Sequence, residues 1–341
     1  MKTILVTGAG GYIGSSLTSM LLEAGNRVIG VDRYFFGTDF LADIFSNAAY
    51  SPVKKDIREL TPKDLEGVDA VCDLAALSND PSGDLDPDLT QSINHLGRVS
   101  VAKAAREAGV PRYVLASSCS VYGQAAGTHL TEESEPRPLT IYAKANLAAE
   151  REILPMANDK FAVTALRQAT VFGLSRRMRF DLVINLMTLN AVQKSQIFVL
   201  GGGKQWRPIV HVADTSRAFI QVLESEPSQV NGEIFNVGLT NMQVLSLAYI
   251  VRENIPFPIQ MQVVPDDPDK RNYNVSFDKI QKQLGYAAKL SPAEGVREIY
   301  EALKMGRIGP DPYTYTVNWY RQILDAKALI DRVMINGRLF K

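Results

Sequence analysis

Short apolar runs alternate with longer amphipathic stretches through the first half of the chain. The apolar runs predict strands near 3–7, 27–32, 69–75, 112–117 and 161–166. The amphipathic stretches predict helices near 12–24, 88–108 and 140–157. Alternation of this kind is typical of a parallel sheet covered by helices on both faces. We therefore expect an α/β fold built on a doubly wound parallel sheet.

The pattern changes after residue 170, where segments rich in Pro, Arg and Asn interrupt the alternation. Two later apolar runs, near 208–212 and 233–237, look like strands that return to the first sheet. We expect a sheet domain over 1–170, a smaller α/β substrate lobe over 171–310 and a helical tail over 311–341. Ligands of open α/β sheets bind at the carboxyl ends of the strands, so the smaller lobe should close over that edge.

The turn after the first predicted strand is rich in glycine. Gly8 suits a tight turn, Gly11 allows a pyrophosphate to approach the backbone, and Gly14 allows close packing of helix on strand. The following helix then directs its free N–H groups at the phosphates. The next predicted strand ends in Asp32, where a ribose-binding carboxylate belongs. An ordinary strand–turn–helix is the alternative for the glycines alone, and the whole pattern favours a Rossmann dinucleotide site.

Composition and charge limit the kinds of partner and cellular location that we expect, and they leave the expected fold unchanged. The 341 residues include 37 basic and 37 acidic side chains, so charge gives no reason to invoke nucleic acid or a membrane surface. Cys72 and Cys119 lie in apolar stretches and are expected to be buried free thiols. The three histidines have no metal-ligand spacing. A strand at the first residues and the absence of a membrane-length apolar run favour a cytoplasmic protein.

A second group of residues follows the strand near 112–117. Ser117, Ser118 and Ser120 lie at its carboxyl end, and Tyr142 opens the next helical pattern. Taken alone, the serines could simply end a strand and Tyr142 could be a packing residue. Together with the glycine turn, this set resembles the extended short-chain dehydrogenase/reductase superfamily, in particular its nucleotide-sugar epimerases and dehydratases. The resemblance covers most of the chain up to about residue 300. Further matching pieces are Asp56-Ile57, Leu74-Ala-Ala76, Asn94, Tyr122-Gly123 and the stretch 205–214.

The resemblance implies a role for each matching residue. Tyr142 is implied to move the hydroxyl proton, Ser118 to hold the reacting sugar oxygen and Arg207 to clamp the diphosphate. Asp32 favours NAD over NADP, whereas Arg33 keeps NADP open. The implied cofactor-binding residues are Gly8, Gly11, Tyr12, Ile13, Gly14, Asp32, Arg33, Asp56, Ile57, Ala75, Ala76, Asn94 and Tyr142. The implied substrate-binding residues are Ser78, Ser118, Ser120, Thr170, Arg179, Arg207 and Arg271.

The chain departs from the family at one catalytic position. The family carries a lysine four residues after the tyrosine, and this chain has Asn146 there. That residue lies over the face of Tyr142, whereas Lys144 points to another side of the helix. A lysine at about 5 Å would favour the tyrosinate by roughly 3 kcal/mol. Asn146 can hold a ribose but brings no charge, so Asn146→Lys is expected to move the acidic limb of the rate profile to lower pH.

The reaction implied by the resemblance begins with hydride removal from a sugar carbon, usually C4. Cys119 and Ser120 stand where 4,6-dehydratases have an acid pair, which leaves a 4-epimerase as the simplest reading. A keto-sugar reductase, a dehydratase and a non-catalytic dinucleotide-binding protein stay open. The stretch 31–37 is similar to UDP-glucuronate decarboxylases and 4-epimerases, so the sugar could be an acid. Arg177 or Arg179 could then pair with its carboxylate. The alternative is that Arg176, Arg177 and Arg179 belong to a solvated loop. A homodimer through helices 88–108 and 140–157 is also implied. The first helix offers Leu96, Val99, Ala102 and Ala105 for close packing, which a monomer could equally bury against its sheet.

Overall fold

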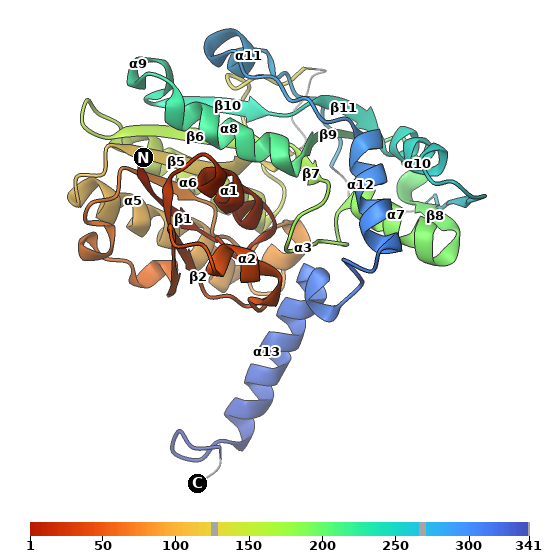
Figure 1. Ribbon diagram of the computed structural model, residues 1–341, viewed down its shortest axis with the longest axis horizontal. Helices are drawn as coiled ribbons and strands as arrows, with labels where there is room; N and C mark the ends of the chain where they lie inside the picture. Colours follow the sequence, from red (N-terminus) through yellow and green to blue (C-terminus); the bar gives the residue numbers. More distant parts are fainter. Residues whose placement is uncertain (124–128, 266–270, 340–341) are drawn as a thin grey trace.

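A computed structural model of the protein describes residues 1–123, 129–265 and 271–339. Within these residues the centre of the fold is a seven-stranded sheet in the order β10-β6-β5-β4-β1-β2-β3, with every pair parallel (Figure 1). The predicted doubly wound parallel sheet is confirmed. Its strands are β1 (Thr3–Thr7), β2 (Arg27–Asp32), β3 (Tyr50–Lys54), β4 (Ala70–Asp73), β5 (Arg112–Ser118), β6 (Ala162–Gln168) and β10 (Glu233–Val237).

The strand order reverses beside β1, which pairs with β2 on one side and with β4 on the other. The connections after β1 and β4 therefore leave in opposite directions and open a crevice at the carboxyl edge of the sheet. Thr7, the last residue of β1, aligns with Val31 on one neighbour and with Asp73 on the other. The segments that directly follow β1, β2, β4 and β5 therefore all lie at the carboxyl edge of the sheet.

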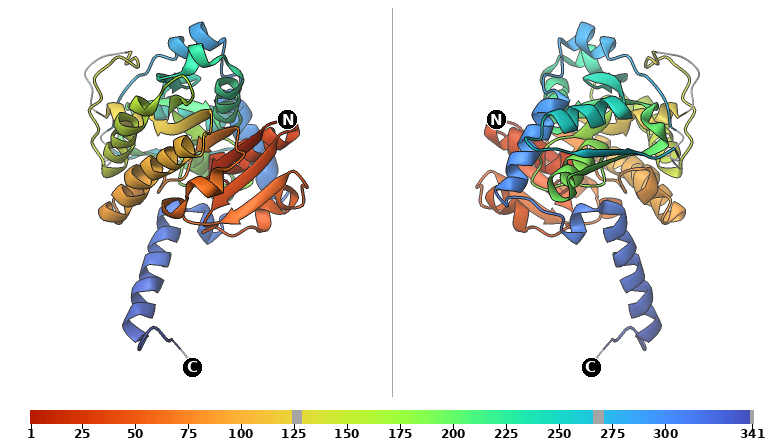
Figure 2. Two further views of the ribbon diagram at one scale, coloured as in Figure 1. Left: turned by 90° about the vertical axis from the view of Figure 1, so that its left-hand side faces the viewer. Right: turned by 90° about the vertical axis from the view of Figure 1, so that its right-hand side faces the viewer.

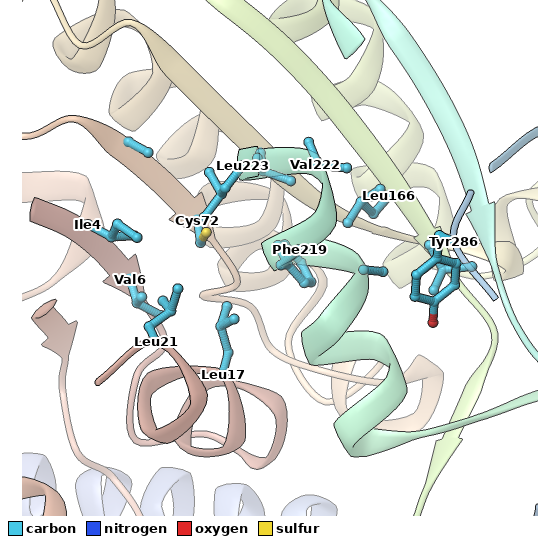
Figure 3. Close-up of a cluster of buried hydrophobic side chains, with 14 of the residues drawn as sticks. Ile4, Val6, Leu17, Leu21, Cys72, Leu166, Phe219, Val222, Leu223 and Tyr286 are labelled. Atoms are coloured by element: carbon cyan, nitrogen blue, oxygen red, sulfur yellow. The ribbon is translucent and has the colours of Figure 1, made fainter. Parts of the chain in front are cut away.

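One face of the sheet is covered by α1 (Tyr12–Glu23) and α8 (Val212–Glu224). Figure 3 shows how Val6 of β1, Leu17 of α1 and Phe219 of α8 meet in this layer. These three side chains are 0% exposed. Burial of this kind contributes about 25 cal/mol for each Å² of apolar surface, so the layer fixes where α1 begins relative to β1.

The opposite face is covered by α5 (Arg98–Glu107) and α6 (Ile141–Ile153). The helix expected over 88–108 is a continuous helical run that begins with α4 (Pro87–Thr90), passes through the π-helical segment η4 (Gln91–Gly97) and ends with α5. Val99, Ala102 and Ala105 all pack in this inner layer. They are therefore buried by the chain's own sheet, and of the four residues expected at a dimer interface only Leu96 is exposed, at 55%.

The second lobe contains two small sheets. Its strands are β7 (Thr170–Phe172), β8 (Gln196–Val199), β9 (Trp206–His211), β11 (Thr240–Gln243) and β12 (Gln260–Val263), in the orders β11-β9-β7 and β12-β8. The longer helices around them are α7 (Val183–Lys194), α10 (Val244–Glu253) and α12 (Pro292–Lys304). Apart from α4, the short α-helices in the described residues are α2 (Ala42–Phe45), α3 (Asp80–Gly83), α9 (Pro227–Val230) and α11 (Asp278–Leu284).

One strand of this lobe corrects a prediction. The apolar run near 208–212 belongs to β9, which pairs with β7 and β11 and does not return to the main sheet. The run near 233–237 does join that sheet, as β10 beside β6. The two runs look alike in the sequence because an apolar pattern reports burial and does not identify the sheet in which a strand is buried.

The C-terminal segment leaves the body of the molecule as a helix, α13 (Thr316–Val333). Figures 1 and 2 show that most of its length projects away from both lobes, whereas its first turns lie against the body. Cys72 and Cys119 are both free and buried. None of the helices in the described part of the chain combines the length and apolar character that a membrane span needs.

Candidate active site

The glycine turn between β1 and α1 forms a cradle in which side chains have no room. Gly8 has φ +68°, and a Cβ there would lie 3.0 Å from the backbone of Ala75. A Cβ at Gly14 would lie only 1.9 Å from the carbonyl oxygen of Gly8. The backbone N–H of Gly11 donates to the same oxygen, and α1 begins at Tyr12. The start of α1 is thus open to an anion, as a pyrophosphate requires.

Asp32 lies at the end of β2 with its carboxylate held by two backbone groups. Its Oδ2 accepts from the N–H of Gly10 at 2.9 Å, and its Oδ1 accepts from the N–H of Tyr34 at 2.7 Å. Burial raises the pKa of Asp32 above its usual range, against these hydrogen bonds. Each oxygen keeps a further acceptor site toward the cavity, which suits the two hydroxyls of a ribose. The cradle and this carboxylate together fit a dinucleotide.

Asp56 and Arg33 form the outer rim of this part of the site. Asp56 accepts from Arg58 at 2.7 Å and from Arg33 at 3.1 Å, and the hydrogen bonds from Arg58 lower its pKa to about 2. Arg33 also lies over the ring of Phe35, 4.7 Å from its centroid. Arg33 is the residue that left NADP possible as the cofactor. Its guanidinium is bound by the carboxylate of Asp56 and lies over the ring of Phe35 at the rim of the site.

A cavity of about 670 Å³ runs from the glycine cradle to the second lobe. It gathers residues that are far apart in the chain but follow the carboxyl ends of β1, β2, β4, β5 and β6. The predicted site residues that line it are Gly8, Gly11, Tyr12, Ile13, Gly14, Asp32, Arg33, Asp56, Ile57, Ala75, Ala76, Ser78, Ser118, Tyr142, Asn146, Thr170, Arg179, Arg207 and Arg271.

Two predicted site residues lie behind the cavity wall. Asn94, expected to bind the cofactor, is 0% exposed, and its side chain amide instead bonds the backbone N–H and C=O of Leu77. Ser120, expected to bind substrate, is buried in the 3-10 turn η5 (Cys119–Tyr122). Its backbone N–H donates to the side chain of Ser118, so Ser120 acts on the site through its neighbour. Neither residue lines the cavity, so the binding roles of Asn94 and Ser120 stay predictions.

Tyr142 and Ser118 meet inside the cavity. Ser118 ends β5 and Tyr142 lies in the first turn of α6, which Thr140 caps by accepting from the N–H of Ala143. Both side chains line this cavity, and Ser118 is close enough to lower the pKa of Tyr142 as a hydrogen-bonding neighbour. Gly83 of α3 packs on Tyr142 so closely that a Cβ there would lie 3.0 Å from the tyrosine Cβ. The start of the Tyr142 side chain is therefore held tightly against α3.

Several charges act on the hydroxyl of Tyr142. Burial raises its pKa, and the nearby carboxylate of Asp80 raises it further. Arg98, the hydrogen bond from Ser118 and Arg179 act in the opposite direction and lower it. Asp80 itself forms an ion pair with Arg271. The result is a phenol whose proton affinity depends on fixed neighbouring charges.

The three arginines after β7 separate into different roles. Arg176 pairs with Asp43 outside the cavity. Arg177 lies over Phe36, 3.6 Å from the ring centroid, and donates to Thr316 of α13 at 2.9 Å. Arg179 is paired with Asp181 at 2.8 Å and also donates to Ser78. Of the three, Arg179 is the one whose charge reaches Tyr142.

The tail contributes to the site, a role that was not predicted from the sequence. Trp319 of α13 donates through Nε1 to the carbonyl of Phe35 at 2.6 Å. Tyr320 lines the cavity, with its ring centroid 6.1 Å from Phe35 and 5.5 Å from Phe36. Because Phe35 and Phe36 closely follow Asp32, α13 covers the ribose end of the crevice. A contact across nearly three hundred residues leaves no local signal in the sequence.

The parallel sheet, the glycine cradle and the carboxylate of Asp32 at the end of β2 fit a nucleotide-binding protein of the extended short-chain dehydrogenase/reductase class. The sequence profile of the NAD dependent epimerase/dehydratase family matches residues 4–238, and the chain belongs to this family. NAD, the cofactor expected from the sequence, is confirmed by this membership. Members of the family are nucleotide-sugar epimerases, dehydratases and decarboxylases.

Individual relatives lie at moderate distance. The chain is 29% identical over 311 residues to UDP-glucuronic acid decarboxylase 1 of Arabidopsis thaliana, covering 86% of this chain and 68% of that protein. It is 29% identical over 248 residues to the uncharacterized UDP-glucose epimerase YtcB of Bacillus subtilis (strain 168), covering 69% of this chain and 76% of that protein. The structure of MoeE5 in complex with UDP-glucuronic acid and NAD has 28% identity and a TM-score of 0.79, covering 89% of this chain and 99% of that one.

Proposed function

We propose that the protein is an NAD-dependent 4-epimerase of a UDP-linked sugar. The observation that carries this proposal is that Tyr142 and Ser118 are neighbours in the lining of the cavity that also contains the glycine cradle. Such a pair supplies an acid/base group and an orienting hydroxyl at the same point. UDP is supported by the relatives, whose names include a UDP-glucuronic acid decarboxylase and a UDP-glucose epimerase.

Each side chain has a defined part in the reaction. NAD, held by the glycine cradle and Asp32, would supply a reversible hydride acceptor beside the sugar carbon. Tyr142, as the phenolate, takes the proton of the C4 hydroxyl while Ser118 donates a hydrogen bond to that oxygen, and loss of the C4 hydrogen as hydride leaves a C4 ketone. After the keto sugar turns its other face, hydride returns to C4 and Tyr142 returns the proton to the oxygen. The reaction has no net oxidation.

The residues after Ser118 support an epimerase over a dehydratase. Cys119 is buried and its thiol donates to the carbonyl of Arg167, and burial raises the pKa of that thiol far above its usual range. Ser120 lies behind the cavity wall. A dehydratase needs a second acid/base group at the sugar, and neither residue supplies one.

A UDP-linked hexuronic acid is the substrate that we place first. Arg179 lines the cavity and its charge reaches Tyr142, so a sugar carboxylate near C4 would lie within its field. Arg177 also lines the cavity, where its guanidinium lies over Phe36 and donates to Thr316 of α13, so Arg179 is the candidate that we place first. The names of the plant relative and of the MoeE5 complex, both of which mention UDP-glucuronic acid, support the same choice.

The test is conversion of UDP-glucuronic acid to UDP-galacturonic acid, with UDP-glucose and UDP-galactose as a second pair, followed by chromatography. We expect turnover by the purified protein with its bound NAD and no net change in nicotinamide absorbance. Tyr142→Phe should lower turnover by about 10²- to 10⁴-fold without loss of bound NAD. Tyr249→Phe, an exposed tyrosine on α10, is the matched control and should be unaffected.

Two results would contradict the proposal. Stoichiometric consumption of reduced nicotinamide would make the protein a keto-sugar reductase. Tight NAD binding with no turnover of any nucleotide sugar, even at high pH, would make it a binding protein.

We also propose a homodimer with Leu96 at its interface. Light scattering should give the mass of two chains, and Leu96→Arg should reduce it to one.

A further inference from the structure

A buried guanidinium lies beside the position where the family carries its lysine. Arg98, the first residue of α5, is 1% exposed, and its Nη1 donates to Oδ1 of Asn146 at 2.8 Å. Nδ2 of Asn146 donates in turn to the carbonyl oxygen of Tyr142 at 2.9 Å. Two consecutive hydrogen bonds therefore connect the guanidinium to the helical turn that carries the tyrosine.

The remaining donors of Arg98 fix it in place. Nε donates to the carboxylate of Asp73 at 3.2 Å, and Nη2 donates to the carbonyl oxygens of Asp73 and Ala116. Ala116 is two residues before Ser118 on β5. The guanidinium is thus held between β4, β5 and α6, next to both members of the tyrosine–serine pair.

The charge of Arg98 is permanent and directional. Arginine does not lose its proton in proteins. Its counter-charge, the carboxylate of Asp73, accepts hydroxyl hydrogen bonds from Thr7 and, at 2.6 Å, from Tyr113. The negative end of the pair therefore faces the sheet, whereas Nη1 faces Asn146 and α6. Buried charges are screened less by water than exposed ones, so the positive end acts on its neighbours more strongly than a surface charge would.

The other charges around Tyr142 come in pairs as well. Asp80 of α3 is paired with Arg271, and Arg179 is paired with Asp181. Arg98 favours the tyrosinate more strongly than Arg179 does. It is therefore the leading cationic influence on the phenol.

We propose that Arg98 is a positioning residue that supplies, from α5, the fixed positive charge absent at Asn146, with Asn146 linking it to Tyr142. This inference rests on the proposed function. It also explains why residue 146 is not lysine. A lysine there would set an ammonium group against the guanidinium of Arg98 and remove the amide oxygen that accepts from it, at a site that is 1% exposed.

The experiment removes the positive charge at residue 98 and restores a positive charge at residue 146. Arg98→Met should lower turnover of the UDP-sugar at neutral pH about tenfold and shift the acidic limb of the rate profile to higher pH. Arg98→Lys should stay near the wild-type profile. The double variant Arg98→Met with Asn146→Lys should bring the limb back, because it returns a cation to the family position. Asp73→Asn, which leaves Arg98 without its counter-charge, should shift the limb to lower pH.

A second readout does not need turnover. Tyrosine labelled at Cζ with a stable carbon isotope can be titrated by NMR in the NAD-bound protein, with the Tyr142 signal identified by its loss in Tyr142→Phe. Its midpoint should rise in Arg98→Met and fall in Asp73→Asn. Arg167→Met, which breaks a buried pair with Glu150 on the same helix, is the control and should leave the midpoint unchanged.

The two proposals fail in different ways. An unchanged Tyr142 midpoint in both Arg98→Met and Asp73→Asn overturns the role of Arg98, whatever the turnover. Should Arg98→Met fail to fold, Asp73→Asn and Arg98→Lys still decide the matter. If the wild-type protein turns over no UDP-sugar while the titration midpoint of Tyr142 still depends on Arg98, the proposed epimerase activity is wrong. The effect of Arg98 on the pKa of Tyr142 would then still stand.

Discussion

At the scale of single residues, the site is governed by which charges face the phenol of Tyr142. Asp80 is the carboxylate that opposes its ionisation, and Arg98 is the buried cation that favours it. A base works in its deprotonated form, so turnover falls when the pH drops through the pKa of that base. Every substitution that changes one of these charges therefore has a predictable sign.

We predict that Asp80→Asn shifts the acidic limb to lower pH. Removing the carboxylate lowers the pKa of Tyr142, because the tyrosinate then meets one negative charge fewer. Turnover on the acidic side should rise several-fold relative to the optimum. The measurement is kcat against pH with saturating UDP-sugar. Asp84→Asn, an exposed carboxylate just past α3, should leave the profile in place, and a shift to higher pH in Asp80→Asn would refute this account.

At the scale of elements, the local pattern of apolar residues was sufficient to predict the strands in the interior of the main sheet. The expected strands 3–7 and 27–32 coincide with β1 and β2. The edge strand β3 was not predicted, because Tyr50–Lys54 contains a proline and mostly exposed or half-buried residues and so lacks an apolar pattern. Strand β9 was assigned to the wrong sheet for the related reason that sheet membership depends on distant segments.

The same limit applies to the site. The glycines, Ser118 and Tyr142 could be found because each lies in a motif of fixed spacing at a strand end. Arg98 could not, because one arginine at the start of an amphipathic helix usually belongs to a solvated face, and its burial depends on Asp73 and Asn146. Those partners lie 25 and 48 residues away, and their spacing has no local period.

The junction of β1 and α1 gives a prediction at this scale. Gly14→Ala would improve helix propensity by about 1 kcal/mol, but the new Cβ would lie 1.9 Å from the carbonyl oxygen of Gly8. Backbone atoms must shift to relieve that contact, and overpacking costs about 1–3 kcal/mol, so destabilisation should win. We expect a lower midpoint of thermal unfolding and loss of most bound NAD. Gly309→Ala, with open space around its Cβ, is the matched control, and equal NAD content in both variants would contradict this reasoning.

At the scale of the whole molecule, the cofactor crevice is closed by both ends of the chain. The glycine cradle and Asp32 come from the first 32 residues, and Trp319 and Tyr320 come from α13. The second half of α13 has no such contact and projects from the body (Figure 2). The proposed epimerase must retain NAD through each cycle, and a cover at the ribose end favours retention over exchange.

The last prediction separates the two halves of α13. Deleting residues 312–341 removes the hydrogen bond from Trp319 and the ring contacts of Tyr320 with Phe35 and Phe36. One hydrogen bond and two aromatic contacts contribute roughly 1 kcal/mol each, so NAD should bind at least about tenfold more weakly. Deleting only 329–341 keeps these contacts and should leave affinity unchanged. Calorimetric titration of the NAD-free protein measures both, and equal affinities would show that α13 is not part of the cofactor site. Loss of affinity in the shorter deletion as well would instead place the effect in the projecting half, since that variant retains every contact between α13 and Phe35.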